Sequence, residues 1–337
     1  FLSAAFATGS ALSSVGMMWL VRRVNWRRAG SVTLCLLLVP TALAINADSK
    51  LPFLLLQGCA ALGSGSTYSL ALTALSDRSH PDRAFGLSVA AQVSFQVVGM
   101  LLLPGLVERA GIDGILILFV AMQLLGLGIL RWLPARGRPH EAGASRKALF
   151  NPVVLLALGG CFFFFFNVGA VWTYIERMAV LSGLEGAQIG LALAIGVSLG
   201  IPGALLASWC GERFGRLKPL ALGAVGTVGA LALLGEGMSL STYVAAAALY
   251  NFVWNFSLPF QYAAVNEVDD GGTGVAAAPA FHGAGVAVGP AIAALYVSEA
   301  SLGAVNLVAG AGVIASLLLF IGAIALHDRG DRHGQGG

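Results

Sequence analysis

The sequence predicts an all-α polytopic membrane protein with eleven membrane spans in two halves. Of the 337 residues, 57% are hydrophobic and only 10% are charged, whereas soluble domains carry about 25% charged residues. Apolar runs alternate with short polar loops, and many of these runs have about 20 residues, the length that crosses a bilayer core. Two basic turns, residues 21–28 and 209–219, lie about half a chain apart. This repetition indicates two related halves.

Hydropathy gives the positions of the predicted spans. In chain order they are 1–20, 31–47, 51–75, 84–106, 112–133, 151–175, 187–209, 219–236, 241–263, 275–297 and 301–326.

The basic residues support this count and fix an orientation. With the first residue outside and the spans alternating, Lys50, Arg109 and Arg177 fall outside, and the other 16 of the 19 Lys and Arg residues fall inside. Cytoplasmic loops carry an excess of Lys and Arg. We therefore expect the loops after spans 1–20 and 187–209 to be cytoplasmic.

The polar interruptions predict the domain organisation. We expect an N-terminal half at 1–134, a cytoplasmic linker at 135–150, a C-terminal half at 151–326 and a disordered cytoplasmic tail at 327–337. Eleven spans put the two ends of this sequence on opposite sides, and its first residue is Phe1 rather than Met. One further helix before Phe1 would complete two six-helix halves, so we expect the first helix to be missing.

Several function classes lack their sequence signals. There is no G-x-x-x-x-G-K-[ST] loop, no H-E-x-x-H and no G-x-S-x-G, the patterns of nucleotide binding, zinc proteolysis and serine hydrolysis. The four cysteines fit neither a metal site nor a disulfide framework, and a net charge of +3 does not suggest nucleic acid. We expect no metal, no cofactor and no enzyme activity. A membrane-embedded enzyme is disfavoured because the five histidines are scattered.

Polar faces within the spans predict where a solute binds. Asn251, Trp254 and Asn255 share one face of the span 241–263, and such side chains are unfavourable against lipid. Tyr174 and Gln92 are the further candidates for solute contact. The alternative is that these amides only hydrogen-bond neighbouring helices.

Two ionisable residues are candidates for moving a proton. Glu176 ends the span 151–175, and His282 lies in the span 275–297. Ionisable groups within a membrane are costly and therefore suggest function, and histidine titrates near neutral pH. The structural alternatives are a surface ion pair of Glu176 with Arg177 and a hydrogen-bonded packing role for His282.

The loops carry a pattern known from one transporter family. In the turn 209–219, Glu212, Arg213, Gly215 and Arg216 occupy the acidic, basic, glycine and basic positions of G-x-x-x-D-R-x-G-R-R. In the turn 21–28, Arg23 matches, while Arg22 replaces the acid and Asn25 the glycine. Gly285, Gly289 and Pro290 match G-x-x-x-G-P in a later span. With these motifs the whole chain resembles the major facilitator superfamily, as helices 2 to 12 of a twelve-helix carrier.

The resemblance implies a function and partners. It implies a secondary active transporter of a small organic solute that works by alternating access with proton coupling, and we favour efflux. The alternatives are an uptake carrier of a sugar or organic metabolite and a non-transporting membrane sensor. The loop motifs, Arg23 included, are implied to tie helix ends together. We expect a monomer in the bacterial inner membrane, with solute, protons and lipid as partners.

Overall fold

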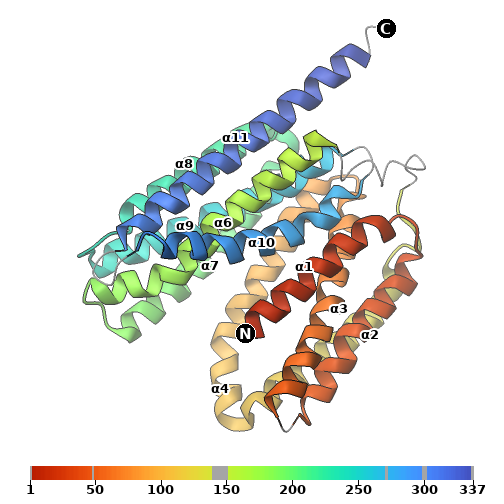
Figure 1. The fold of residues 1–337 in the computed structure, drawn as a ribbon, viewed down its shortest axis with the longest axis horizontal. Helices are drawn as coiled ribbons and strands as arrows, with labels where there is room; N and C mark the ends of the chain where they lie inside the picture. Colours follow the sequence, from red (N-terminus) through yellow and green to blue (C-terminus); the bar gives the residue numbers. More distant parts are fainter. Residues whose placement is uncertain (1, 48, 139–150, 270–271, 298–301, 335–337) are drawn as a thin grey trace. The chain divides into compact units, whose positions relative to one another are not determined.

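The described part of the chain is almost entirely helical. The computed structural model describes residues 2–47, 49–138, 151–269, 272–297 and 302–334. Its α-helices are α1 Leu2–Leu20, α2 Trp26–Ala44, α3 Lys50–Ser76, α4 Pro81–Ile129, α6 Pro152–Leu181, α7 Gly186–Cys210, α8 Leu217–Leu233, α9 Leu240–Glu267, α10 Gly274–Ala294 and α11 Gly303–Gly334, with short 3₁₀ turns η1 Leu130–Trp132 and η2 Gly211–Phe214 (Figure 1).

Every predicted span overlaps one of these helices, and α4 contains two of them. The two parts of α4 meet at Gly111, which has φ 63° and interrupts the helical geometry; glycine adopts such a positive φ without steric cost. Among the described residues, six helices are long and apolar enough to cross a membrane. The number of eleven spans therefore stays a prediction.

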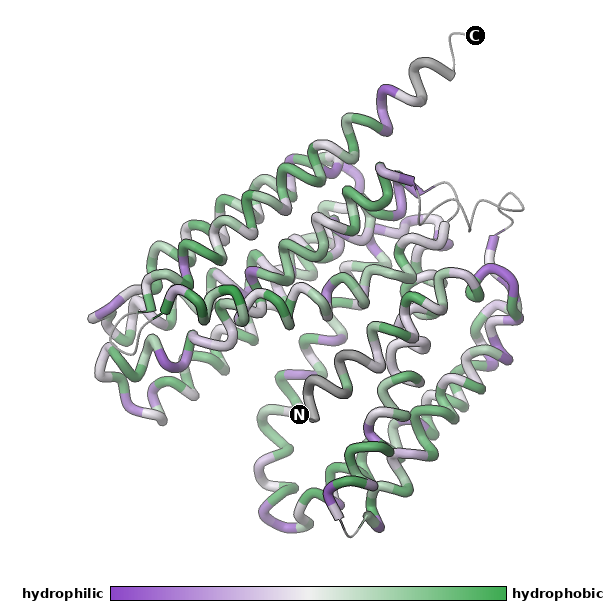
Figure 2. The backbone as a smooth tube through the Cα atoms, viewed as in Figure 1, coloured by the Kyte–Doolittle hydropathy of each residue, from purple (hydrophilic) through white to green (hydrophobic). Residues whose placement is uncertain are grey.

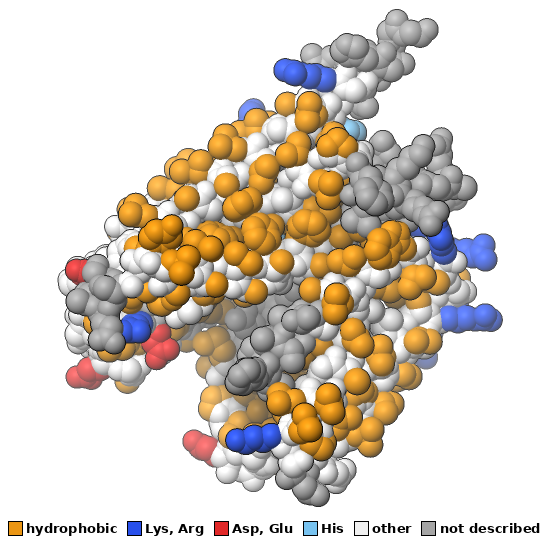
Figure 3. Space-filling view, in the orientation of Figure 1, with side chains coloured by type: hydrophobic (Ala, Val, Ile, Leu, Met, Phe, Trp, Pro, Cys, Tyr) orange, Lys and Arg blue, Asp and Glu red, His pale blue; other side chains and the backbone are white. Residues whose placement is uncertain are grey.

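Hydrophobic residues run along the helices and polar residues gather at their ends. Figure 2 shows this alternation along the backbone, with hydrophilic positions concentrated at turns. In Figure 3, hydrophobic side chains cover much of the visible helix surface, and charged side chains lie mainly near helix ends. Helices suit the hydrocarbon core of a lipid bilayer because they satisfy their backbone hydrogen bonds internally.

Side-chain caps explain where several helices begin. The Asn25 side chain accepts hydrogen bonds from the Arg27 and Arg28 backbone N–H groups at the start of α2. Asn151 caps α6 in the same way, and Ser239 caps α9. Asn is a favoured N-cap residue, which gives Asn25 a role at a position where the family pattern has glycine.

The end of the chain differs from the expectation of a disordered tail. Helix α11 continues to Gly334, so residues 327–334 are helical, while 335–337 lie outside the described residues. The polar composition suggested disorder, but extending an existing helix adds one hydrogen bond for each residue fixed and needs no new nucleus. Of the predicted linker, residues 139–150 also lie outside the described part.

The chain divides into two compact units, each described by itself. Unit 1 contains Phe1–Asp77, Val98–Leu149 and Asp270–Gly283, and unit 2 contains Arg78–Val97, Phe150–Asp269 and Ala284–Gly337. Each unit thus combines most of one predicted half with a short segment of the other. The predicted boundaries of the halves remain a prediction.

In unit 1, helices α1 and α2 both pack on α3. The contacts are close because α3 presents glycine: a Cβ on Gly65 would lie 2.2 Å from the Ser10 carbonyl oxygen, and one on Gly63 would lie 2.6 Å from that of Thr33. The first turn of α10 joins this unit, where Ala276 packs with Met17 and Leu70. Small residues at such crossings are typical of helix packing in membranes.

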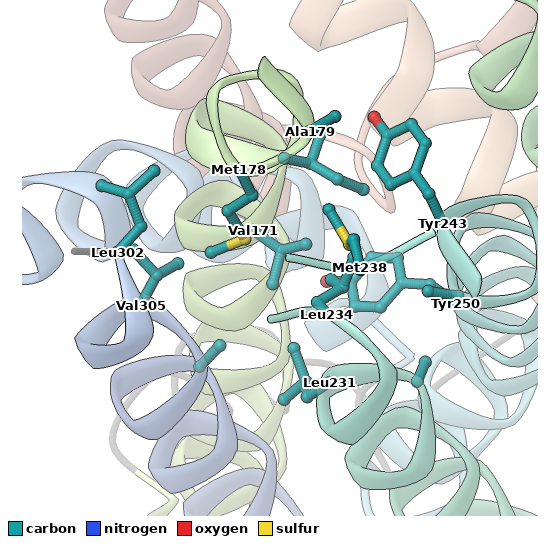
Figure 4. Packing of buried hydrophobic residues seen from close by; sticks show 14 of the residues in the cluster. Val171, Met178, Ala179, Leu231, Leu234, Met238, Tyr243, Tyr250, Leu302 and Val305 are labelled. Atoms are coloured by element: carbon teal, nitrogen blue, oxygen red, sulfur yellow. The ribbon is translucent and has the colours of Figure 1, made fainter. Parts of the chain in front are cut away.

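In unit 2, α7 packs on α9 and α6 on α11. A large apolar cluster forms at the predicted outer ends of these helices, and Figure 4 shows Met178 of α6 and Met238 within it, with Tyr243 of α9 at one edge. The helix α10 approaches α6 through glycine: a Cβ on Gly289 would lie 2.0 Å from the Phe166 carbonyl oxygen. The apolar cluster fixes α6 and α9 next to each other, which positions the residues described next.

Candidate solute site and loop charge clusters

Helices α6 and α9 of unit 2 bring aromatic and amide side chains together. On α9, Trp254 follows Asn251 by three residues and precedes Asn255, so the three share a face. The Trp254 ring lies 6.1 Å from that of Phe165 and 6.2 Å from that of Trp172, between ring centroids. We call the following set the aromatic–amide cluster: Phe165, Asn167, Trp172, Tyr250, Asn251, Trp254 and Asn255.

The two amides of α9 are buried and bond to their own helix. Asn251 and Asn255 are 2% and 6% exposed. The Nδ2 of Asn251 donates to the Ala247 carbonyl at 2.9 Å, and the Nδ2 of Asn255 donates to the Asn251 carbonyl at 2.9 Å. A Cβ on Gly200 would lie 2.5 Å from the Asn255 amide nitrogen, so Asn255 lies against α7. Neither amide faces lipid.

The two indoles of the cluster keep their hydrogen-bonding capacity. The Nε1 atoms of Trp172 and Trp254 are buried and have no hydrogen-bond partner among the described residues. Beside them, Tyr250 interacts with Asn167. A buried donor without a partner costs free energy, and a ligand with acceptor atoms would recover it. The arrangement is suited to an apolar compound that carries hydrogen-bond acceptors.

Tyr174 and Gln92 take different positions from the amides. Tyr174 is partly buried and packs against the apolar cluster beside Trp172. Gln92 lies in the part of α4 that belongs to unit 2, with an exposed side chain whose Nε2 donates to Ser88 at 3.3 Å. It is two helical turns beyond Phe85, whose ring contacts Tyr262 of α9 at 5.4 Å. Both remain predicted contacts.

The two predicted proton carriers belong to different units of the structure. Glu176 is exposed at the predicted outer end of α6 and interacts electrostatically with Tyr243. No ion pair of Glu176 with Arg177 occurs among the described residues. His282 is 6% exposed on the part of α10 that belongs to unit 1, so it does not join Glu176 within one unit.

The turn between α7 and α8 organises a charge cluster in unit 2. The Arg216 guanidinium forms an ion pair with Asp82 at the start of α4 and donates from Nε to Glu267 at the end of α9, at 2.5 Å. Gly215 has φ 67°, a conformation that L side chains rarely adopt, and it turns the chain into α8. We call Arg216, Asp82 and Glu267 the second charge cluster.

The other two residues of that predicted loop motif point to the surface. Glu212 is exposed, and the Arg213 guanidinium lies 5.0 Å from the centroid of the Trp209 ring. This cation–π geometry places Arg213 over the end of α7. Only Arg216, of the four motif residues, links separate helices through its charge.

A matching cluster in unit 1 uses a residue that the sequence pattern did not select. Arg22 holds both carboxylate oxygens of Asp77 through Nη1, at 2.8 and 2.7 Å, and donates from Nη2 to the Gly272 carbonyl at 2.6 Å. The predicted Arg23 is exposed. We call Arg22, Asp77 and Gly272 the first charge cluster.

A repeat in the sequence would have found the partners of these arginines. Glu267 follows Asp77 by 190 residues, and Gly272 follows Asp82 by the same 190. The offset is close to the distance in sequence between the two basic turns, residues 21–28 and 209–219. The two clusters therefore occupy equivalent ends of α3 and α9, and equivalent starts of α4 and α10.

Comparison with known families and structures gives one consistent result. The sequence profile of the Major Facilitator Superfamily matches residues 1–270. No curated protein sequence matches the chain. Similar solved structures include the human organic anion transporter MFSD10 (TETRAN), with 17% identity over 95% of this chain and 82% of that chain and a TM-score of 0.79.

Two further structures show the same fold. The transporter FucP in the outward conformation has 14% identity over 96% of this chain and 89% of that chain, with a TM-score of 0.81. A bacterial homologue of the iron transporter ferroportin has 14% identity over 96% and 90%, with a TM-score of 0.75. At such identities the likeness concerns the fold. The profile match, the helical membrane fold and the repeated loop clusters together show that this chain belongs to the Major Facilitator Superfamily of secondary transporters.

Proposed function

We propose that this Major Facilitator protein is a proton-coupled secondary transporter that exports a small, neutral or weakly charged amphipathic solute. The observation that supports this most is the aromatic–amide cluster, in which the rings of Trp172 and Trp254 pack edge-on and their buried N–H donors have no partner among the described residues. The cluster contains no ionised side chain, so a strongly charged solute would lose its hydration without gaining a partner.

Export is the direction that fits such a solute. An amphipathic compound dissolves in the bilayer and enters a cell unaided, so a carrier is needed to remove it rather than to admit it. Alternating access through a site on α6 and α9 would take the solute from the inner side to the outer side. A bacterial inner membrane is the setting that we propose.

Glu176 and His282 are the proposed proton carriers. Glu176 is exposed at the predicted outer end of α6, where it can exchange protons with the outer solution. His282 lies buried on α10. Proton coupling is a mode of action of other proteins with this fold, since similar structures include the fucose:proton symporter FucP and the proton:xylose symporter XylE.

The first test is proton movement in vesicles that contain the intact protein. A pH-sensitive dye is followed while sugars, amino acids, organic acids and amphipathic drugs are added in turn. We expect proton flux with amphipathic compounds, lost in Glu176→Gln or His282→Ala and retained in the control Glu236→Gln, an exposed acid between α8 and α9. Unchanged flux in the double variant of Glu176 and His282 would refute the coupling assignment.

The solute site is tested separately with Trp254. Trp254→Phe keeps a ring between Phe165 and Trp172 but removes the indole N–H, and Trp254→Leu removes both. We expect the apparent affinity to fall by about tenfold in the first variant for solutes with acceptor atoms, and further in the second. The control Trp132→Leu alters an exposed indole. Equal effects of Trp132→Leu and Trp254→Leu would exclude this site.

Counterflow separates export from the remaining alternatives. Vesicles are loaded with unlabelled solute, and labelled solute is followed in right-side-out and inverted preparations. Proton-driven accumulation only in inverted vesicles supports export. Accumulation only in right-side-out vesicles would establish uptake, and binding without counterflow would establish a sensor.

A further inference from the structure

The segment that leads into the predicted cytoplasmic linker lies against unit 1. Residues 133–138 follow η1 as irregular backbone, and we call them the linker strap. The Ala135 carbonyl accepts a hydrogen bond from the Trp26 backbone N–H at 2.8 Å. The Leu133 carbonyl accepts one from Nε of Arg27 at 2.6 Å, although the two residues are 106 positions apart in the sequence. The start of α2 therefore holds the strap through two hydrogen bonds.

Trp26 is the buried residue on which the strap lies. It is 1% exposed, and its Nε1 donates to the Val21 carbonyl at 2.6 Å. Trp26 belongs to the small apolar cluster of unit 1 that contains Met17 and Ala276, and Leu133 of the strap packs against that cluster. The strap is thus anchored to the packed interior of unit 1.

The far end of the strap binds the acid of the first charge cluster. The Arg138 backbone N–H donates to Oδ2 of Asp77 at 2.7 Å. Nη1 of Arg22 binds the same oxygen at 2.7 Å. A Cβ on Gly137 would lie 2.6 Å from that oxygen and 2.7 Å from Nη1 of Arg22, and it would also collide with the Trp26 ring. The strap fits this place because residue 137 has no side chain.

Arg22 connects the strap to the segment that begins α10. Its guanidinium donates from Nε and Nη2 to the Gly272 carbonyl at 2.8 and 2.6 Å. The side chains of Arg22 and Asp77 are only 9% and 11% exposed, so the charge-assisted hydrogen bonds between them are partly shielded from water. Hydrogen bonds in such a network polarise one another and stabilise one another. The Arg138 donor on Asp77 and the Arg22 donors on Gly272 therefore belong to one network.

We propose that the linker strap controls the first charge cluster. When the strap is docked, the Arg138 N–H fixes the Asp77 carboxylate next to Arg22, and Arg22 stays on the Gly272 carbonyl. When the strap leaves, Asp77 loses a donor, and the first turns of α10 open more readily. A ligand or a force that removes the linker from unit 1 is thereby transmitted to residues 272–283 without contact with them.

Hydrogen exchange of the intact protein tests this dependence. Gly137→Val displaces the strap, because the added atoms meet the Trp26 ring and the Asp77 carboxylate. We expect amide exchange in residues 272–283 to become about tenfold faster, the effect of losing one hydrogen bond to a charged group. Gly235→Val is the matched control, at an exposed glycine outside the helices with open space for a side chain. Unchanged exchange in residues 272–283 of Gly137→Val, or an equal rise in both variants, would overturn the proposal.

A double variant shows whether the effect passes through Arg22. In the background of Arg22→Gln the bonds to Gly272 are already lost. Adding Gly137→Val should then raise exchange in residues 272–283 by less than about twofold, because coupled sites do not add. A further tenfold rise would show that the strap acts on α10 by another route and would refute control through the first charge cluster.

A milder variant guards against a strap variant that fails to fold. Arg27→Met keeps the apolar stem of an exposed side chain and removes only its donor to Leu133. It should speed exchange in residues 26–30 and, by a smaller factor, in 272–283, whereas Arg28→Met, at the exposed neighbour, should change neither. Equal behaviour of the two variants would refute docking of the strap. The measurement needs no solute, so its outcome is independent of the proposed transport function.

Discussion

At the residue scale, the Asp82 carboxyl combines deep burial with a single charged partner. Burial raises the pKa of Asp82 above its ordinary value, although the Arg216 guanidinium opposes the change. The Asp82 carboxyl therefore binds its proton more tightly in the folded protein than in the unfolded chain. The carboxyl favours the folded state most at low pH, and this contribution is lost as the pH rises through the raised pKa. Arg216 becomes necessary once the carboxyl is ionised.

Removing that partner has a predictable cost. In Arg216→Gln the ionised Asp82 stays buried without a counter-charge, and we expect a loss of about 3 kcal/mol of stability at neutral pH. The loss should shrink as the pH is lowered, because Asp82 then takes up a proton. Thermal unfolding in detergent across a pH series measures it. Arg78→Gln, an exposed arginine in the turn that precedes α4, should change little.

A second substitution separates charge from packing. If the unpaired carboxylate causes the loss, then Asp82→Asn in the background of Arg216→Gln restores part of the stability, since no buried charge remains. A double variant no more stable than Arg216→Gln would show that Arg216 acts by filling space. The difference between the stability change of the double variant and the sum of the changes in the two single variants measures the coupling between Asp82 and Arg216.

At the element scale, glycines set how closely α10 approaches α6. The backbone of Phe166 occupies the space where a Gly289 side chain would stand. A larger residue must push the helices apart, because a backbone cannot rotate away as a side chain can. The glycine is thus required by packing rather than by a turn.

We expect Gly289→Val to destabilise unit 2 strongly. Overpacking in a filled interior costs about 1–3 kcal/mol, and a clash with backbone belongs at the upper end. Gly190→Val on α7, where the space is open, is the matched control for β-branching in a helix. Thermal unfolding of both variants measures the two losses of stability, and we expect the larger loss in Gly289→Val. Equal losses would mean that helix propensity, not the contact with α6, explains the glycine.

At the scale of the whole molecule, the two charge clusters join segments from both halves of the sequence. Arg22 reaches the carbonyl of Gly272 in unit 1, and Arg216 reaches Asp82 in unit 2. Each cluster holds a helix start against ends of helices from the other half. The role that the family resemblance implies for the loop motifs, to tie helix ends together, stays a prediction.

Hydrogen exchange can test the two clusters independently. Arg22→Gln should speed backbone exchange in residues 272–283 and leave 78–97 unchanged, whereas Arg216→Gln should do the reverse. The reason is that each variant removes a bond within one unit only. Exchange that rises equally in both segments for either variant would contradict this independence. Arg28→Gln should leave both segments unchanged.

The sequence predicted the helices well because hydropathy and helix length follow from the bilayer itself. It predicted a break between spans at 84–106 and 112–133, and the structure interrupts the helical geometry at Gly111, between these two ranges. It missed Arg22 because the family pattern reserves that position for an acid. Its partner Asp77 lies 55 residues away, and only the packing of α1 on α3 brings the two together. Likewise, spacing grouped Asn255 with Trp254 but could not reveal that its amide lies against α7.

The exchange of segments between the units has a consequence for biosynthesis. Arg22 and Ser69 emerge early, yet the carbonyls of Gly272 and Ala276 that they bind belong to the end of unit 1. The partners are 250 residues apart for Arg22 and 207 residues apart for Ser69, so translation of the chain between them takes about 10–50 s at ordinary rates of synthesis. During that interval the helices already inserted in the membrane lack these two hydrogen-bond partners. We expect lipid headgroups or the insertion machinery to bind the Arg22 and Ser69 donors until residues 272–276 are inserted.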